Sequence, residues 1–286
     1  MSKGIAKISM VYDYIRWEEK AIADAAKKRG VDLKLIDSKD VSLLLDSNYE
    51  EEFGNVVLQR CLSYFRSLHL TAALEAKGIS VINNFKVALT AGNKLFTTLA
   101  LIKTGVPTPR TALSFVSESA IKSLERLGYP SVLKPTIGSW GRLVALLKDR
   151  DSAEAIFEDR EHMFPLYQVY YIQEYVKRPP RDIRSIVIDD RVVAAIYRVS
   201  LSGNWKTNMA LGAKAENCPI TKELEDICVK ASKAVGGGIL GVDCMESPNG
   251  LLVHEVNNTT EFKNTVPTTG VDIPGLIIDY LVKFRK

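Results

Sequence analysis

Three oxygen-bearing side chains follow two apolar runs near the C-terminus. Asp243 comes directly after residues 239–242, and Glu255 and Asn257 come after residues 251–253. Successive side chains of a strand point to opposite faces, so Glu255 and Asn257 share one face. Mg²⁺ prefers such oxygen donors, and apolar flanks make an unpaired inward carboxylate costly. The pattern indicates a magnesium site, and solvated polar residues at strand ends are the alternative.

A lysine and a glycine-containing loop form a second candidate site. Lys134 ends a short apolar run, and Gly138, Ser139, Trp140 and Gly141 follow in the loop after it. Backbone N–H groups and an ammonium group can together neutralise phosphate. The GxxxxGK[ST] pattern of a P-loop is absent. The loop therefore favours phosphate binding of another kind, and a structural β-turn remains the alternative.

Three more polar segments carry groups that recognise nucleotides or anions. Glu174 ends an apolar run and has the groups to hydrogen-bond a purine or a ribose. Arg184 precedes another run and is suited to a bidentate phosphate contact, with a surface ion pair to Asp182 as the alternative. Lys206 and Asn208 supply donors for phosphoryl or carboxylate oxygens, unless they belong to an ordinary polar loop.

Strands and helices alternate along the chain, which predicts an α/β fold with a small open lobe to about residue 90. The Pro107-Thr108-Pro109 segment marks a boundary, and Pro248-Asn249-Gly250 predicts a hairpin turn. The periodicity predicts strands at 6–12, 31–36, 55–58, 80–82, 131–134, 144–147, 170–175, 185–188, 192–197, 239–245 and 251–256, and helices at 17–29, 62–76, 94–103, 120–127, 151–159, 221–235 and 273–284.

Composition narrows the class of protein. The 286 residues are 46% hydrophobic and 25% charged, which suits a globular protein with a sizeable core. A net charge of +4 gives no argument for nucleic-acid binding, although it permits a local basic patch. The four cysteines form no CxxC pair and are expected to be buried or free thiols. With no signal-peptide pattern and no apolar stretch of about 20 residues, a cytoplasmic protein without a membrane partner is expected.

The order of these segments resembles the ATP-grasp ligases over nearly the whole chain. It is most similar to the branch that contains the ribosomal protein S6 modification ligases, and within it to the ligases that act on the small acidic amino-group carrier protein LysW. The narrower match lies in residues 137–142, 215–219, 255–264 and 268–275. The resemblance implies three lobes, at residues 1–92, 93–176 and 177–286, with ATP between the last two.

The resemblance also implies roles for individual residues. Phosphate-binding, adenine-binding and ribose-binding groups would be Lys94, Lys134, the loop Gly138-Ser139-Trp140-Gly141, Glu174, Tyr175, Val176 and Asp182. One or two Mg²⁺ ions would be held by Asp243, Glu255 and Asn257. Catalytic groups at the transferring phosphoryl would be Arg184, Asn208 and Lys134, and substrate-binding groups would be Arg198, Lys206, Asn208, Asn257 and Thr259.

The implied reaction activates a carboxylate as an acyl phosphate, which an amine then attacks. The carboxylate would be the C-terminal glutamate side chain of the carrier, and the amine that of glutamate or α-aminoadipate. Lysine-pathway relatives tend to carry Ala-Arg-Gly-Gly where this chain has Ala210-Leu211-Gly212-Ala213. This difference favours glutamate, with α-aminoadipate or an S6-type glutamate ligase as alternatives. The resemblance further implies a homo-oligomer, a dimer or tetramer, and the candidate carrier-docking residues are Arg16, Arg60, Arg66 and Lys263.

Overall fold

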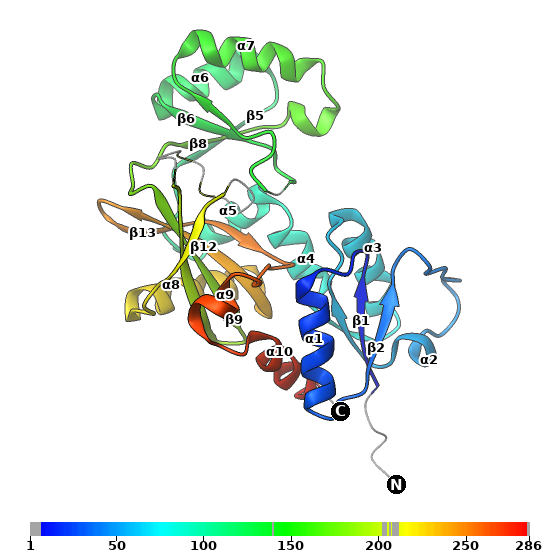
Figure 1. The fold of residues 1–286 in the computed structure, drawn as a ribbon. Coiled ribbons are helices and arrows are strands. Elements are labelled where there is room, and N and C mark those ends of the chain that lie inside the picture. The colour runs from blue at the N-terminus through cyan, green and yellow to red at the C-terminus, as the bar shows by residue number, and fades with distance from the viewer. Residues whose placement is uncertain (1–6, 139, 202–204, 206, 208–211, 285–286) are drawn as a thin grey trace.

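The computed structural model describes residues 7–138, 140–201, 205, 207 and 212–284. In this part of the chain, the strands form three sheets, each in its own lobe. Figure 1 shows the central lobe at the top, the N-terminal lobe at the lower right and the C-terminal lobe at the lower left. The α/β architecture of three lobes that the resemblance implies is present. The boundaries near residues 92 and 176 remain our proposal, and α5 (Lys94–Lys103) at the start of the central segment packs against the C-terminal lobe.

The N-terminal lobe contains a parallel sheet with the strand order β2-β1-β3-β4. Short apolar runs separated by helices favour such parallel pairing. The first helix ends before Gly30, whose φ of +64° is a conformation that glycine adopts readily. The elements are β1 (Ile8–Tyr12), α1 (Trp17–Lys28), β2 (Leu33–Asp37), α2 (Glu50–Phe53), β3 (Val56–Gln59), α3 (Tyr64–Glu75), β4 (Ser80–Ile82) and α4 (Phe85–Ala91).

The central lobe contains an antiparallel sheet with the order β5-β8-β6-β7, covered by two helices (Figure 1). Leu124, Phe157 and Tyr170 are fully buried between the helices and the sheet. The elements are β5 (Thr111–Ser114), α6 (Ser117–Leu127), β6 (Ser131–Lys134), β7 (Ala145–Leu147), α7 (Arg150–Glu161), the 3₁₀ helix η1 (Pro165–Gln168) and β8 (Tyr170–Glu174).

The C-terminal lobe contains an antiparallel sheet with the order β11-β10-β9-β12-β13. One face packs on α8 and α5, and the other faces α10 and the N-terminal lobe. Thr221 caps α8 by accepting a hydrogen bond from the Leu224 N–H. The elements are β9 (Arg181–Ile188), β10 (Arg191–Val199), β11 (Lys214–Asn217), α8 (Lys222–Val235), β12 (Ile239–Ser247), β13 (Gly250–Asn257), α9 (Thr265–Thr269) and α10 (Ile273–Val282).

A buried ion pair lies where the N-terminal and C-terminal lobes meet, beside the packed helices α1 and α10. Arg60 Nε donates to Glu19 Oε1 at 2.9 Å, and Arg60 Nη1 donates to the carbonyl of Thr260 at 3.1 Å. Both side chains of the pair are almost inaccessible to solvent. Arg60 was expected on a carrier-docking surface, and that expectation is wrong because the residue is buried in the lobe interface.

Glu19→Met is expected to lower the free energy of unfolding by about 3 kcal/mol, because one partner of a buried ion pair then loses its compensating charge. The double variant Glu19→Met, Arg60→Met is expected to recover part of this loss, since the buried Arg60 charge is removed together with its partner, and Arg16, which also donates to Glu19, keeps its ion pair with Glu261. Equilibrium urea unfolding measures both effects. A single variant as stable as the wild type would contradict the assignment.

Several short elements were not expected from the sequence: α2, α4, β5, η1, β11 and α9. They are too short for a hydrophobic period to be recognised. The expectation for the cysteines is confirmed, because all four are buried free thiols. No helix in the described part of the chain is both long and apolar enough to cross a membrane.

Candidate active site

A cavity of about 1280 Å³ lies where the three lobes meet. Its wall includes Asp13 from the N-terminal lobe, Lys134 and Trp140 from the central lobe, and Asp243 and Glu255 from the C-terminal lobe. The cavity is large enough for a nucleotide together with parts of two further substrates. All the sequence-predicted site residues that the structure describes lie in its wall.

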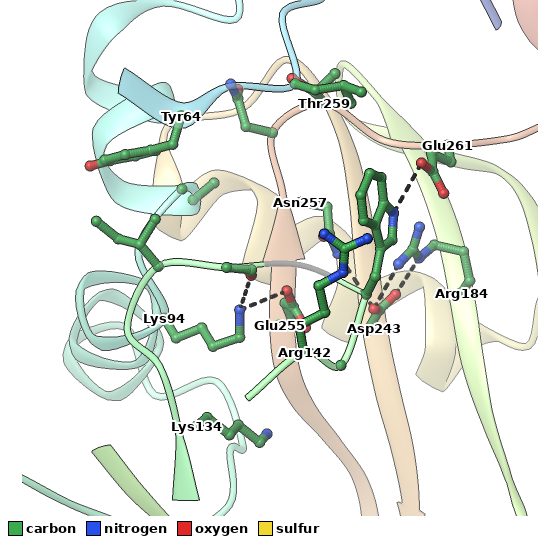
Figure 2. A pocket seen from close by; sticks show the side chains of 18 of the residues that line it. Tyr64, Lys94, Lys134, Arg142, Arg184, Asp243, Glu255, Asn257, Thr259 and Glu261 are labelled. Carbon is green, nitrogen blue, oxygen red and sulfur yellow. Dashed lines mark hydrogen bonds and ion pairs between the residues drawn. The ribbon is translucent and has the colours of Figure 1, made fainter. Parts of the chain in front are cut away.

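A β-bulge decides which side chains of β13 face this cavity. Asp243 is opposite Glu255, whereas the next residue of β12, Cys244, is opposite Val253. The extra residue is His254, so both His254 and Glu255 line the cavity. Asn257 lines it as well, as the period of two predicts. Asp243, Glu255 and Asn257 are therefore brought together at one sheet edge (Figure 2).

Asp243 is the centre of a buried network of charges. Arg184 donates to both carboxylate oxygens, with 2.8 Å between its Nη2 and Oδ2, and Arg198 Nη2 donates to Oδ2 at 3.0 Å. Burial by itself raises the pKa of Asp243, but the two guanidinium groups outweigh this and hold the pKa well below its ordinary value. Asp243 is thus ionised at every physiological pH, and Arg184 lies beside it rather than paired with Asp182.

Arg198 and Asp182 extend the same network by a second ion pair. Arg198 donates to both oxygens of Asp182 at 2.7 and 2.8 Å, and Thr207 Oγ1 donates to Asp182 at 2.6 Å. Burial lowers the pKa of Arg198, and the neighbouring carboxylates Asp243 and Asp182 reverse this, so that its pKa is raised. Arg198 was expected to hold a substrate carboxylate and Asp182 to approach a ribose. The structure places both in internal ion pairs, in which Arg198 contacts Asp243 directly and Asp182 contacts Arg198. Both residues also line the cavity, and their contact with a substrate remains a proposal.

Two lysines face the cavity from the opposite side. Lys94 lies at the start of α5, and its Nζ is 3.2 Å from Glu255 Oε1 and donates to the Gly138 carbonyl at 2.7 Å. Lys134 ends β6, and its Nζ donates to Gln173 Oε1 at 2.6 Å. Burial lowers the pKa of Lys134 to about 8. Both residues line the cavity, and their contact with ATP phosphates remains a proposal.

The segment after β8 forms a further part of the wall. Glu174 Oε1 accepts the N–H of Arg110 at 2.8 Å, so this carboxylate fixes the start of β5. Tyr175 is partly exposed and packs edge-to-face on Trp205 at 6.4 Å. Contact of Glu174, Tyr175 and Val176 with an adenine remains a proposal, which their place in the cavity wall supports.

The donor set fits Mg²⁺. The two carboxylates of Asp243 and Glu255 and the amide of Asn257 lie together. No group of three or more His, Cys, Asp or Glu side chains arranged to hold a metal ion occurs in the described residues, so a metal here would rest on two carboxylates and an amide. Asn257 Nδ2 lies 3.4 Å from Asp243 Oδ2, so the amide oxygen is turned away from that carboxylate. Mg²⁺ usually takes one or two protein carboxylates and completes its shell with phosphates and waters.

Some expected residues cannot be placed, and some unexpected ones lie in the site. Ser139, Lys206 and Asn208 fall outside the described residues. Thr259 donates to the Cys61 carbonyl at 3.3 Å. His254 was missed: both of its ring nitrogens are buried with no protein partner among the described residues, and burial lowers its pKa well below the ordinary value. Only the bulge in β13 brings it to the cavity, and the sequence carries no local signal for that.

Comparison with known proteins identifies the family. The sequence pattern of the RimK-like ATP-grasp domain matches residues 91–281, and that of the LysX preATP-grasp domain matches residues 8–90. The chain is 38% identical over 283 residues to the alpha-aminoadipate–LysW ligase LysX of Sulfurisphaera tokodaii, covering 98% of this chain and 99% of the relative. It is 32% identical over 279 residues to the glutamate–LysW ligase ArgX of the same organism, covering 96% and 98%.

A solved structure agrees with the fold. The RimK domain ATP-grasp protein of Sphaerobacter thermophilus superposes with a TM-score of 0.82 at 24% identity, covering 96% of this chain and 99% of that one. The charged cavity between lobes, the two family patterns and the relatives that match along nearly their whole length agree with one another. The chain belongs to the RimK-like ATP-grasp family and is an ATP-dependent carboxylate–amine ligase.

Proposed function

We propose that this ligase joins the α-amino group of α-aminoadipate to the C-terminal glutamate side chain of a LysW-type carrier protein. The observation that supports this choice is the higher identity to the LysX ligase than to the ArgX ligase, 38% against 32%, over almost the same length. It favours the alternative that the sequence analysis kept open over its first choice, glutamate. The carrier as partner is supported by the same two relatives.

The cavity residues supply what phosphoryl transfer requires. The γ-phosphoryl passes from ATP to the carrier carboxylate, which gives ADP and an acyl phosphate. Lys94, Lys134 and Arg184 all line the cavity, so they can neutralise the transferring group. Lys94 and Arg184 are paired with Glu255 and Asp243 in this structure, so they exchange part of these contacts for phosphate oxygens. Bound Mg²⁺, held by Asp243, Glu255 and Asn257, would supply further charge neutralisation and orient the phosphates.

The second step forms the amide bond. The amine of the amino acid attacks the acyl carbon, phosphate leaves, and the nitrogen loses a proton. His254 is uncharged at neutral pH, and among the described residues its two ring nitrogens have no partner, so it can hydrogen-bond a substrate without adding charge. The acyl phosphate hydrolyses in open water, which requires that the cavity be closed during this step.

Glutamate remains the second candidate because of one stretch of sequence. Leu211 and Ala213 replace the Arg and Gly that lysine-pathway relatives tend to carry. Leu211 lies outside the described residues, so this argument rests on the sequence alone. The two amino acids differ by one methylene, which is worth about 1–3 kcal/mol in a pocket.

Release of ADP tests the proposal. With Mg²⁺-ATP and a LysW-type carrier, kcat/KM for α-aminoadipate is expected to exceed that for glutamate by about tenfold or more. A carrier whose C-terminal glutamate has been removed is the control and should give no amide. A preference for glutamate would move the protein to the second candidate. Full turnover without any carrier would contradict the proposed partner.

The same assay tests the sequence argument for glutamate. In the double variant Leu211→Arg, Ala213→Gly, the ratio of kcat/KM for α-aminoadipate to that for glutamate is expected to rise several-fold, because the variant restores the Arg and Gly that lysine-pathway relatives tend to carry in this stretch. The single variant Ala213→Gly is the matched control. An unchanged ratio would show that this stretch does not select the amino acid.

A further inference from the structure

Residues 259–263, called here the strap, continue from β13 of the C-terminal lobe but lie on the N-terminal lobe. Thr259 Oγ1 donates to the carbonyl of Cys61 at 3.3 Å. The buried Arg60 donates to the carbonyl of Thr260 at 3.1 Å. The strap is therefore fixed to the loop after β3, immediately beyond the expected metal ligand Asn257.

The start of α1 holds the second half of the strap. Glu18 Oε1 accepts the backbone N–H groups of Phe262 and Lys263 at 3.1 and 2.9 Å. Glu18 is 3% exposed, so these are well-shielded hydrogen bonds to a charged group. Trp17 packs edge-to-face on Phe262, with 6.1 Å between ring centroids. The backbone on both sides of Glu261 is thus held by the N-terminal lobe.

Glu261, in the C-terminal lobe, forms hydrogen bonds with residues of both other lobes. It accepts the indole N–H of Trp140 from the central lobe at 3.3 Å and Nη1 of Arg16 from the N-terminal lobe at 3.2 Å. In Figure 2 the dashed line from Glu261 marks its hydrogen bond with the indole N–H of Trp140. Trp140 and Glu261 both belong to the cavity wall.

Trp140 lies in the glycine-containing loop, which is anchored at both ends. Lys94 Nζ donates to the Gly138 carbonyl at 2.7 Å, and Arg160 Nη2 donates to the Leu143 carbonyl at 2.6 Å. Between these anchors, Trp140 has a φ of +59°, a left-handed conformation that costs a non-glycine residue about 1 kcal/mol or more. Such a conformation persists where the surroundings hold it, and the bond to Glu261 is one such constraint.

We propose that Glu261 is a positioning residue that holds the loop over the cavity through Trp140 and, through Arg16 and the strap, makes this closure depend on the N-terminal lobe. The closed loop keeps water from the acyl phosphate until the amine attacks. This role rests on the proposed ligase reaction of the same cavity. Glu261 itself touches no reacting atom.

The first test needs no substrate. Trypsin cleaves after Arg142, an exposed residue of the loop, and cleavage of the native protein follows the population of locally opened loop. Mass spectrometry of the Arg142–Leu143 cleavage is expected to show a rate about threefold higher in Glu261→Ala and in Trp140→Phe, which keeps the ring but loses the indole N–H donor. Glu261→Gln keeps an acceptor oxygen and should stay within about twofold of the wild type.

The second test measures the coupling of ATP use to product. The number of ADP molecules released per amide formed is expected to be near one in the wild type and about threefold higher in Glu261→Ala and Trp140→Phe. The double variant should be no worse than the poorer single variant, because both remove one shared bond. Glu118→Ala is the matched control, since Glu118 is an exposed glutamate paired with Lys122 on α6, and it should change neither readout.

Each outcome decides something. Faster cleavage together with poorer coupling supports the proposal. Cleavage that is unchanged in both single variants overturns it, whatever the activity. If cleavage is faster but the number of ADP molecules released per amide is unchanged, the loop does not keep water from the acyl phosphate, and that part of the proposal is overturned. If the wild type forms no amide from the proposed substrates while cleavage responds as expected, the proposed function fails and the positioning of the loop by Glu261 stands.

Discussion

Replacing Asp243 by asparagine is expected to lower kcat by about 1000-fold or more. The carboxylate lies opposite Glu255 and is held ionised by Arg184 and Arg198. Loss of one full negative charge from the proposed magnesium ligands would remove several kcal/mol of charge stabilisation at the phosphates, and about 4 kcal/mol corresponds to 1000-fold. Steady-state ADP release at saturating substrates measures the change.

The structure adds a stability cost to this variant. Without the Asp243 charge, Arg184 loses its carboxylate and Arg198 keeps only Asp182, so the free energy of unfolding is expected to fall by about 2 kcal/mol. Asp279→Asn is the matched control, because Asp279 is an exposed carboxylate paired with Arg29 and should change activity by less than twofold. Turnover of the Asp243 variant within tenfold of the wild type would refute the assignment of Asp243 to the metal site.

Lys134→Met is expected to lower kcat/KM for ATP by about 100-fold, which corresponds to about 2.7 kcal/mol. Lys134 is buried at the end of β6 and lines the cavity, where a phosphate oxygen would be its charged partner. Methionine has a similar volume and flexibility but no charge. Lys122→Met on the exposed face of α6 is the control and should leave kcat/KM unchanged.

The depressed pKa of Lys134 gives this prediction a pH signature. Burial lowers the pKa to about 8, so the free enzyme loses the ammonium charge above pH 8, and kcat/KM for ATP should fall there with an apparent pKa near 8. Bound phosphates favour the charged form, so kcat should persist to higher pH. Lys134→Met should lack this alkaline limb. The same limb in the variant would assign it to another group.

The same lowered pKa predicts that stability rises with pH over the range in which kcat/KM for ATP falls. The folded protein releases the Lys134 proton near pH 8, whereas an unfolded chain keeps it to about pH 10.4. Between these values the unfolded state binds more protons, so the free energy of unfolding of the wild type should rise relative to that of Lys134→Met. Urea unfolding of both proteins at pH 7.5 and 10 measures the difference, and the comparison cancels the contribution of other groups.

The sequence by itself determined the longer helices and strands, and it brought most of the candidate site residues to notice. β4, β6 and α5 lie at the residues that periodicity predicts. The hairpin turn at Pro248-Asn249-Gly250 brings β12 beside β13, which places Asp243 near Glu255 and Asn257. Lys94 and Lys134 lie at element ends facing the cavity, as expected. These features depend on local spacing, and local spacing is present in the sequence.

Tertiary structure alone decided the partners of these side chains. A regular hairpin of β9 and β10 would place Tyr197 opposite Asp182, but a bulge between Val192 and Ala194 places Arg198 there. In the same way, the bulge in β13 sets Glu255 rather than His254 opposite Asp243.

A bulge shifts the register of two strands by one residue and disrupts backbone hydrogen bonds between them. It forms where side-chain packing and charge pairing offset that loss. Arg60 and Glu261 meet partners that lie 200 and 121 residues away in the chain. Contacts over such distances form because separate lobes pack together, so no local pattern encodes them.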